Sequence, residues 1–166
     1  GGGPEGGVPI VRDALAELRR KVGDRHPLVI DMLRSLCALD RATDQLDDAV
    51  RHCRESQSLA EDLHGRDHRA SVDANRQLAA LYVGLGRFSQ AESIFLETFG
   101  WMRSRLDRNH PDLARAYNSL AIVAWERGDV DRALGFQQQA VAAWKTGHND
   151  GLTANGLFNM AMILHS

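Results

Sequence analysis

One sequence pattern occurs three times along this chain of 166 residues, at a fixed spacing of 42 residues. This spacing separates three histidines (68−26 and 110−68 are both 42), three leucines and three alanines: His26, His68 and His110; Leu36, Leu78 and Leu120; Ala49, Ala91 and Ala133. A fixed period of this length is typical of stacked structural repeats, in which each unit buries its apolar face on its neighbours. Such stacks present extended surfaces, so the sequence predicts a protein that works by binding a partner.

The composition removes several other classes of protein. The net charge is −2 and charges of both signs are interspersed, which argues against a nucleic-acid-binding surface. No apolar run approaches the length of a membrane span, and we expect no signal peptide. Cys37 and Cys53 form no framework of spacings; they could meet inside one hairpin, but we expect a pair of reduced thiols in a cytoplasmic protein and not a disulfide.

Each repeat contains two apolar stripes at helical spacing. In the second repeat, Gly84 and Gly86 separate the stripes, and glycine pairs of this kind end helices. The unit is therefore predicted to be a helix, a tight turn, a second helix and a polar linker. The two stripes are Val72, Ala74, Leu78, Ala79 and Tyr82, followed by Phe88, Ala91, Ile94, Phe95, Phe99 and Met102.

The repeat pattern resembles the tetratricopeptide repeat. The residues that carry the resemblance are Asn75, Leu78, Ala79 and Tyr82 with Ala91 and Phe95, and then Tyr117, Leu120 and Ala121 with Ala133. The common period of that family is 34, whereas the period of 42 and junctions such as His26-Pro27 and His110-Pro111 are similar to the kinesin-light-chain type. Asp40 departs from the pattern, because it stands where the second repeat has Tyr82.

This resemblance implies an all-α fold, a right-handed superhelical solenoid of antiparallel helix pairs. About three full repeats are expected, with partial repeats at both ends. We expect a flexible Gly-rich linker or expression remnant over residues 1–9 and a solenoid over 10–166. Its divisions are 10–25, 26–67, 68–109, 110–149 and 150–166.

The resemblance also implies where a ligand binds, because the first helix of each pair lines the concave groove in this family. Arg34, Arg76 and Asn118 would form one row that grips the backbone or acidic side chains of an extended peptide. Further groove residues are expected at Arg41, Asp73, Arg115, Ile122 and Trp125, and the last two would supply an apolar anchor. Asp31, Ala38 and Ala80 are expected to face the same groove.

A simpler interpretation competes with the groove row. Asp31 lies three residues before Arg34, and Asp73 three before Arg76, so both arginines could form ordinary ion pairs within their helices. Trp125 could equally pack in the core between repeats.

Neither a metal site nor an active site is predicted. Three of the seven histidines recur at the repeat period and would lie too far apart to share a zinc ion. Carboxylate pairs such as Asp47-Asp48 are typical of solvated helix surfaces. No cofactor motif follows a strand, so we expect neither cofactor nor enzyme activity.

The leading functional hypothesis is a protein- or peptide-binding scaffold module of a larger signalling or adaptor protein, without nucleic-acid or membrane partners. One alternative is self-association through the apolar last helix, whose apolar residues are Leu157, Phe158, Met160, Met162, Ile163 and Leu164. Another is a sensor domain for a small peptide signal.

Overall fold

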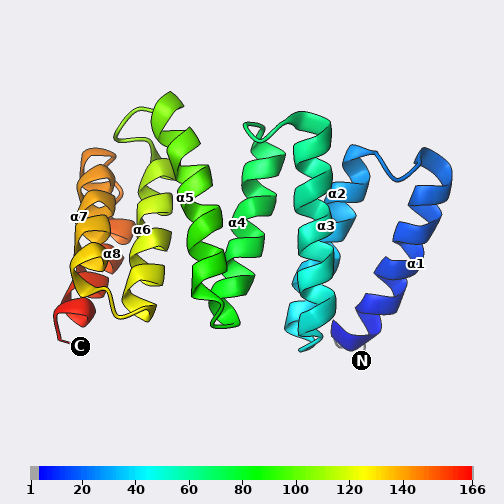
Figure 1. Cartoon of the computed structure of the whole chain (residues 1–166), viewed down its shortest axis with the longest axis horizontal. Coiled ribbons are helices and arrows are strands. Elements are labelled where there is room, and N and C mark those ends of the chain that lie inside the picture. Colours follow the sequence, from blue (N-terminus) through cyan, green and yellow to red (C-terminus); the bar gives the residue numbers. More distant parts are fainter. Residues whose placement is uncertain (1–3, 166) are drawn as a thin grey trace. The chain divides into compact units, whose positions relative to one another are not determined.

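The computed structural model describes residues 4–165, and this part of the chain consists of eight helices without a strand. The chain divides after Leu85 into two compact units of four helices each, α1–α4 and α5–α8 (Figure 1). The helices are α1 (Pro4–Val22), α2 (Pro27–Ala42), α3 (Leu46–His64), α4 (Arg69–Gly84), α5 (Phe88–Arg105), α6 (Pro111–Glu126), α7 (Val130–Thr146) and α8 (Asp150–Leu164).

In the first unit, each helix packs against the next along the chain (Figure 1). Val8 and Leu15 of α1 meet Val29, Leu33 and Leu36 of α2 in one apolar cluster. A second cluster joins α2, α3 and α4 through one residue of each helix: Ile30, Ala60 and Ala74. The apolar stripes predicted from the sequence are thus the buried faces of these helices.

The first helix begins earlier than predicted. Residues 4–9 were expected in the flexible linker but form the first turns of α1, while residues 1–3 lie outside the described part of the chain. Val8 is the reason for the difference, because its side chain is only 2% exposed and belongs to the apolar cluster with α2. Burial of this side chain offsets the poor helix propensity of the neighbouring glycines.

In the second unit, small side chains allow close helix packing. Ala121 of α6 and Ala133 of α7 are both fully buried, as the predicted hairpin requires. Val141 and Trp144 of α7 form a cluster with Ala114 of α6, and Leu152 and Met160 of α8 pack against it. Within the described residues, no helix combines the length and apolar composition that a membrane span needs.

The recurring histidines cap the first helix of each pair. The Nδ1 atoms of His26, His68 and His110 each accept a hydrogen bond, 3.2 Å long, from the backbone amide two residues later. Each contact satisfies one of the amide groups that a helix start leaves without a partner. The 42-residue histidine period therefore has a local structural cause.

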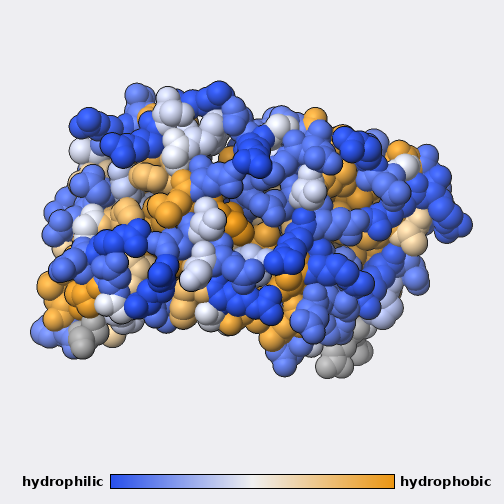
Figure 2. Space-filling view, in the orientation of Figure 1, coloured by the Kyte–Doolittle hydropathy of each residue, from blue (hydrophilic) through white to orange (hydrophobic). Residues whose placement is uncertain are grey.

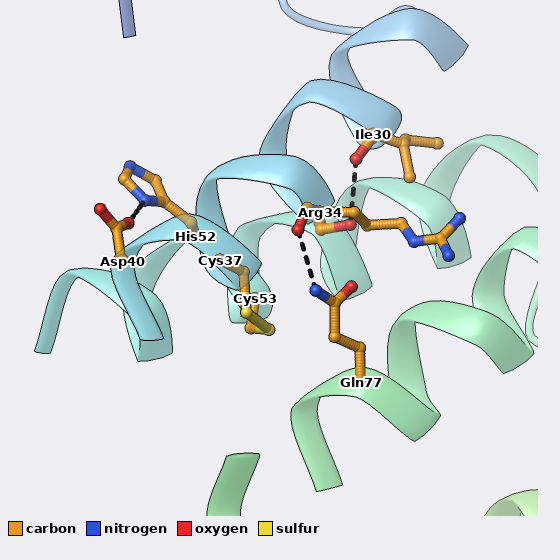
Figure 3. Close-up of a disulfide and its surroundings, with 8 residues drawn as sticks. Ile30, Arg34, Cys37, Asp40, His52, Cys53 and Gln77 are labelled. Carbon is orange, nitrogen blue, oxygen red and sulfur yellow. Dashed lines mark hydrogen bonds and ion pairs between the residues drawn. A yellow bond between two sulfur atoms is a disulfide. The ribbon is translucent and has the colours of Figure 1, made fainter. Parts of the chain in front are cut away.

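The cysteines correct a prediction. Cys37 of α2 and Cys53 of α3 form a disulfide, with Cα atoms 5.3 Å apart, so the expectation of reduced thiols is wrong (Figure 3). Antiparallel packing of α2 and α3 brings the two positions within bridging distance. The bridge ties the two helices of this hairpin together.

Candidate functional site

A pocket of about 530 Å³ lies between α2 and α4 in the first unit. These are the first helices of two successive pairs, the elements on which the sequence placed the groove. The lining comes from α2 (Asp31, Arg34, Ser35, Cys37, Ala38 and Arg41) and from α4 (Arg76, Gln77, Ala80 and Leu81).

Two connections hold the walls of the pocket in place. The amide of Gln77 on α4 donates a hydrogen bond of 2.8 Å to the backbone carbonyl of Arg34 on α2 (Figure 3). The bridge between Cys37, which lines the pocket, and Cys53 fixes α2 to α3. The pocket walls are therefore set by side-chain contacts between elements, which favours a preformed site.

The pocket carries an excess of positive charge. Arg34, Arg41 and Arg76 stand against the single carboxylate of Asp31, a balance of +2 (three minus one). Arg41 forms no ion pair with any described residue. The Nε of Arg34 is buried and lacks a hydrogen-bond partner in the described part of the chain. A planar guanidinium such as that of Arg41, which has no acidic partner in the described chain, suits a carboxylate or phosphate ligand.

The ion pairs of the simpler interpretation also form. Arg34 lies 3.8 Å from Asp31 on α2, and Arg76 lies 3.6 Å from Asp73 on α4, a residue that is not part of the pocket lining. Asp31 and Arg76 are more than 60% exposed. Exposed pairs three residues apart contribute only about 0.2–0.5 kcal/mol, so an acidic ligand can replace them at little cost.

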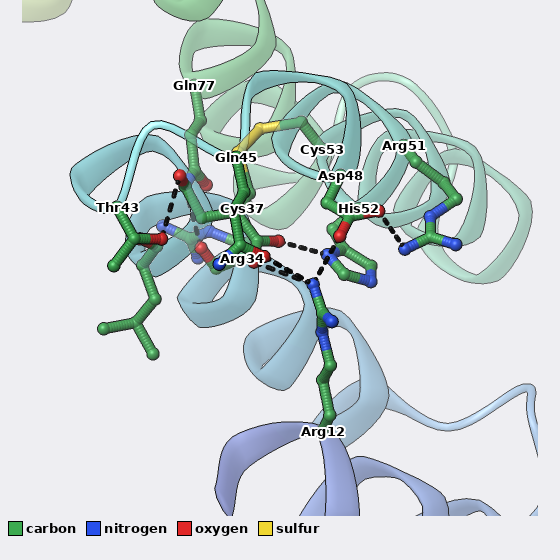
Figure 4. Close-up of polar contacts among 12 residues, drawn as sticks. Arg12, Arg34, Cys37, Thr43, Gln45, Asp48, Arg51, His52, Cys53 and Gln77 are labelled. Carbon is green, nitrogen blue, oxygen red and sulfur yellow. Dashed lines mark hydrogen bonds and ion pairs between the residues drawn. A yellow bond between two sulfur atoms is a disulfide. The ribbon is translucent and has the colours of Figure 1, made fainter. Parts of the chain in front are cut away.

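A polar cluster supports the helices behind this pocket. Asp40 of α2 is fully buried and accepts from Arg12 of α1 at 3.2 Å, while His52 Nδ1 of α3 lies 2.6 Å from its other oxygen. Arg12 also reaches Gln45 at 3.1 Å and Asp48 at 2.5 Å (Figure 4). Asp40, which replaces the tyrosine of the repeat pattern, is thus compensated by partners from two neighbouring helices.

The remaining predicted groove residues lie on α6 in the second unit. Arg115 is bound to Asp112 at 2.6 Å. Asn118 accepts from Gln137 at 3.1 Å and from Asn159 at 3.4 Å. Ile122 is half-buried, and Trp125 packs against the cluster that contains Ile163 of α8. The structure therefore brings Arg34, Arg41 and Arg76 into one pocket. On α6, Arg115, Asn118 and Trp125 contact other residues of the second unit.

Sequence reasoning missed four lining residues: Ser35, Cys37, Gln77 and Leu81. Gln77 carries the bond that joins the two walls, and its place beside Arg76 in the sequence gave no signal of this. Among the described residues, no three or more His, Cys, Asp or Glu side chains gather as metal ligands.

Comparison with known proteins identifies the repeat. The family model for the tetratricopeptide repeat matches residues 28–104 and 73–146. Two crystal structures of nearly identical TPR-like repeats from a candidate kinesin light chain of Podosopora anserina superpose with TM-scores of 0.86 and 0.75. Both are 16% identical to this chain, cover 98% and 97% of it, and are themselves covered over 77% and 87%.

A third similar structure is that of BtubC (BKLC) from P. vanneervenii. Its TM-score is 0.70 at 16% identity, with 95% of this chain and 71% of that chain covered. The comparison with curated proteins gives no match. Repeats of this family generally mediate protein–protein interactions. The chain belongs to the tetratricopeptide-repeat family, with the all-α solenoid fold of kinesin-light-chain-like repeats.

Proposed function

We propose that this chain is a protein-binding scaffold module that holds an extended peptide with acidic groups in the pocket between α2 and α4. The observation that carries the proposal is the convergence of Arg34, Arg41 and Arg76 on one pocket with a single opposing carboxylate.

The chemistry of the pocket favours a carboxylate ligand over an apolar one. Three guanidinium groups supply paired N–H donors that match both oxygens of a carboxylate. Ala38 and Ala80 are small, so a peptide main chain can approach the helices closely between the arginines. The module acts by binding and is proposed to have no enzyme activity of its own.

The test is selection from a random peptide display library, followed by affinity measurements on the selected peptides. We expect enrichment of Asp and Glu, and binding that weakens as salt is raised. The variant Arg34→Gln/Arg76→Gln should lose at least about tenfold in affinity, because each charged hydrogen bond contributes roughly 1.5–3 kcal/mol.

A matched control removes the same charge elsewhere in the first unit. Arg20 and Arg25 also form exposed ion pairs but lie outside the pocket, so Arg20→Gln/Arg25→Gln should bind as the unmodified chain does. An equal loss of peptide affinity in the pocket variant and in the control variant would mean that net charge, and not the pocket, determines binding. Selected peptides without acidic residues would refute the assigned ligand class.

Self-association is a second candidate function. Leu157, Phe158, Met162 and Leu164 of α8 are 45–65% exposed, and Figure 2 shows apolar surface near the C-terminal end. Exposed apolar surface of this kind is typical of an interface. Multi-angle light scattering at rising protein concentration tests this: a dimer that Phe158→Asp dissociates supports it, and a monomer throughout rejects it.

The disulfide bears on where the module works. The expectation of a cytoplasmic location depended on reduced cysteines, and the bond between Cys37 and Cys53 removes that argument. Because disulfides persist mainly in oxidising compartments, we propose such a compartment as the working environment.

A further inference from the structure

A second pocket, of about 510 Å³, lies in the second unit where α5 passes into α6. Its lining differs from that of the α2–α4 pocket, because it includes the second helices of two pairs and a junction between them. The residues are Arg103 of α5, Leu106 and Arg108 of the junction, Leu113 and Tyr117 of α6, and Gln139 of α7.

The charges in this pocket are not balanced by the protein. No carboxylate belongs to the lining, and neither Arg103 nor Arg108 forms an ion pair with another described residue. The nearby carboxylate of Asp112 is engaged by Arg115 at 2.6 Å. Most arginines of the described chain have an acidic partner, whereas these two share one pocket and leave their donors open to an external anion.

Neutral donors stand beside the two guanidinium groups. The hydroxyl of Tyr117 and the amide of Gln139 form no hydrogen bond with any other residue that the structure describes. The Tyr117 ring is held in place by an edge-on contact with Phe99, with centroids 4.8 Å apart. Leu113 is buried and forms an apolar part of the wall, while Arg103, Arg108 and Gln139 are exposed and accessible to a ligand.

We propose that this pocket binds a phosphate monoester. A dianion with three terminal oxygens matches two forked cations together with two neutral donors, and the lining of this pocket, unlike that of the α2–α4 pocket with its Asp31, contains no carboxylate to repel the second negative charge. The phosphoryl group can come from a phosphorylated side chain of a partner or from a small free phosphate. The phosphate site shares no residue with the α2–α4 pocket, so its test is independent of the proposed peptide binding.

The test is an NMR titration of the whole chain at constant ionic strength and about pH 7.5, where a phosphate monoester is dianionic. The probes are inorganic phosphate, phosphoserine, a short neutral peptide containing phosphoserine, and acetate. We expect saturable shifts of the amides of Leu106, Arg108, Leu113 and Tyr117 with every phosphate probe and no saturation with acetate.

The variant Arg103→Gln/Arg108→Gln should weaken phosphate binding by at least about tenfold. The control is Arg87→Gln/Lys145→Gln, because these exposed cations of the same unit have no ion pair with a described residue and lie outside the pocket. It should bind phosphate as the unmodified chain does.

The same titration distinguishes the two sources of the phosphoryl group, a phosphorylated protein and a small free phosphate. Tighter binding of the phosphopeptide than of phosphoserine assigns the site to a phosphorylated protein chain, and equal binding assigns it to a small phosphate. The proposal is overturned if phosphate gives no saturable shifts, if acetate binds as tightly, or if the control variant loses as much affinity as Arg103→Gln/Arg108→Gln.

Discussion

Replacing Gly156 by alanine tests how α8 packs against α7. A methyl group at this position would lie 2.6 Å from Val141 Cγ2, 2.9 Å from Trp144 Cζ3 and 3.2 Å from Gln137 Nε2. The first two distances are shorter than real Cβ contacts, so one of the neighbours must move. All three neighbours are at most 5% exposed and have little room to do so.

The expected cost follows from two opposing contributions. Overpacking of a well-filled core costs about 1–3 kcal/mol, and three simultaneous contacts place this site near the upper end. Because alanine has the higher helix propensity, it stabilises a helix interior by about 1 kcal/mol relative to glycine. The net loss is therefore about 2 kcal/mol, which lowers the Tm of a chain of this length by roughly 4–8 °C.

The assay is thermal and urea unfolding followed by circular dichroism, with Gly135→Ala as the matched control. Gly135 lies inside α7, and a methyl group there would meet no heavy atom within 4 Å. The same substitution should therefore stabilise the protein by about 0.5–1 kcal/mol.

A particular combination of results would refute the reasoning. If both variants raised the Tm equally, the methyl group at residue 156 would meet open space, and α8 would not lie against Val141 and Trp144. If both variants lowered the Tm, the helix-propensity argument for α7 would be wrong instead.

Three further predictions concern the first unit and the helix caps. Removing the disulfide with Cys37→Ala/Cys53→Ala should lower the free energy of urea unfolding by about 3 kcal/mol, because the bridge closes a loop over a separation of 16 residues. A reductant should destabilise the unmodified chain and leave the variant unchanged. His68→Ala should lower stability by about 1 kcal/mol through loss of the bond to the Ala70 amide, whereas His68→Asn, which keeps a capping acceptor, should not; equal Tm values for both would contradict a capping role. Arg12→Met should cost about 2 kcal/mol, since it removes a charged partner from the fully buried Asp40, and adding Asp40→Asn should recover part of that loss; no recovery would mean that the charge of Asp40 is not the cause.

The helical part of the fold could be predicted because its signals are local. The stripe around Leu78 and Tyr82 has helical spacing, and both residues are buried on one face of α4. Buried alanines such as Ala121 and Ala133 mark the places where two helices approach closely. These patterns depend on residues three and four positions apart, which a sequence displays directly.

Features that depend on distant residues could not be predicted. The spacing of Cys37 and Cys53 does not distinguish two thiols from a bridge, because that depends on the distance between α2 and α3. The departure at Asp40 was visible, but its partner Arg12 lies 28 residues earlier, on another helix.

In the candidate site, too, the local features could be predicted from the sequence and the contacts between distant residues could not. The positions of Arg34 and Arg76 on the first helices followed from the repeat register, and the structure places both in one pocket. The bond from Gln77 to the Arg34 carbonyl spans 43 residues and depends on the spacing of α2 and α4. The pocket beside Arg103 and Arg108 brings together three helices and a junction, a juxtaposition that no periodic pattern reports.

Photo-crosslinking of a selected acidic peptide tests the central proposal most directly. The peptide carries a photoreactive group beside its acidic residues, and mass spectrometry of the digested product identifies the attachment sites. The proposal predicts attachment to α2 and α4, around Arg34, Arg41 and Arg76, with loss of the product in Arg34→Gln/Arg76→Gln. Attachment confined to α8, or a product that the variant retains in full, would contradict peptide binding in this pocket.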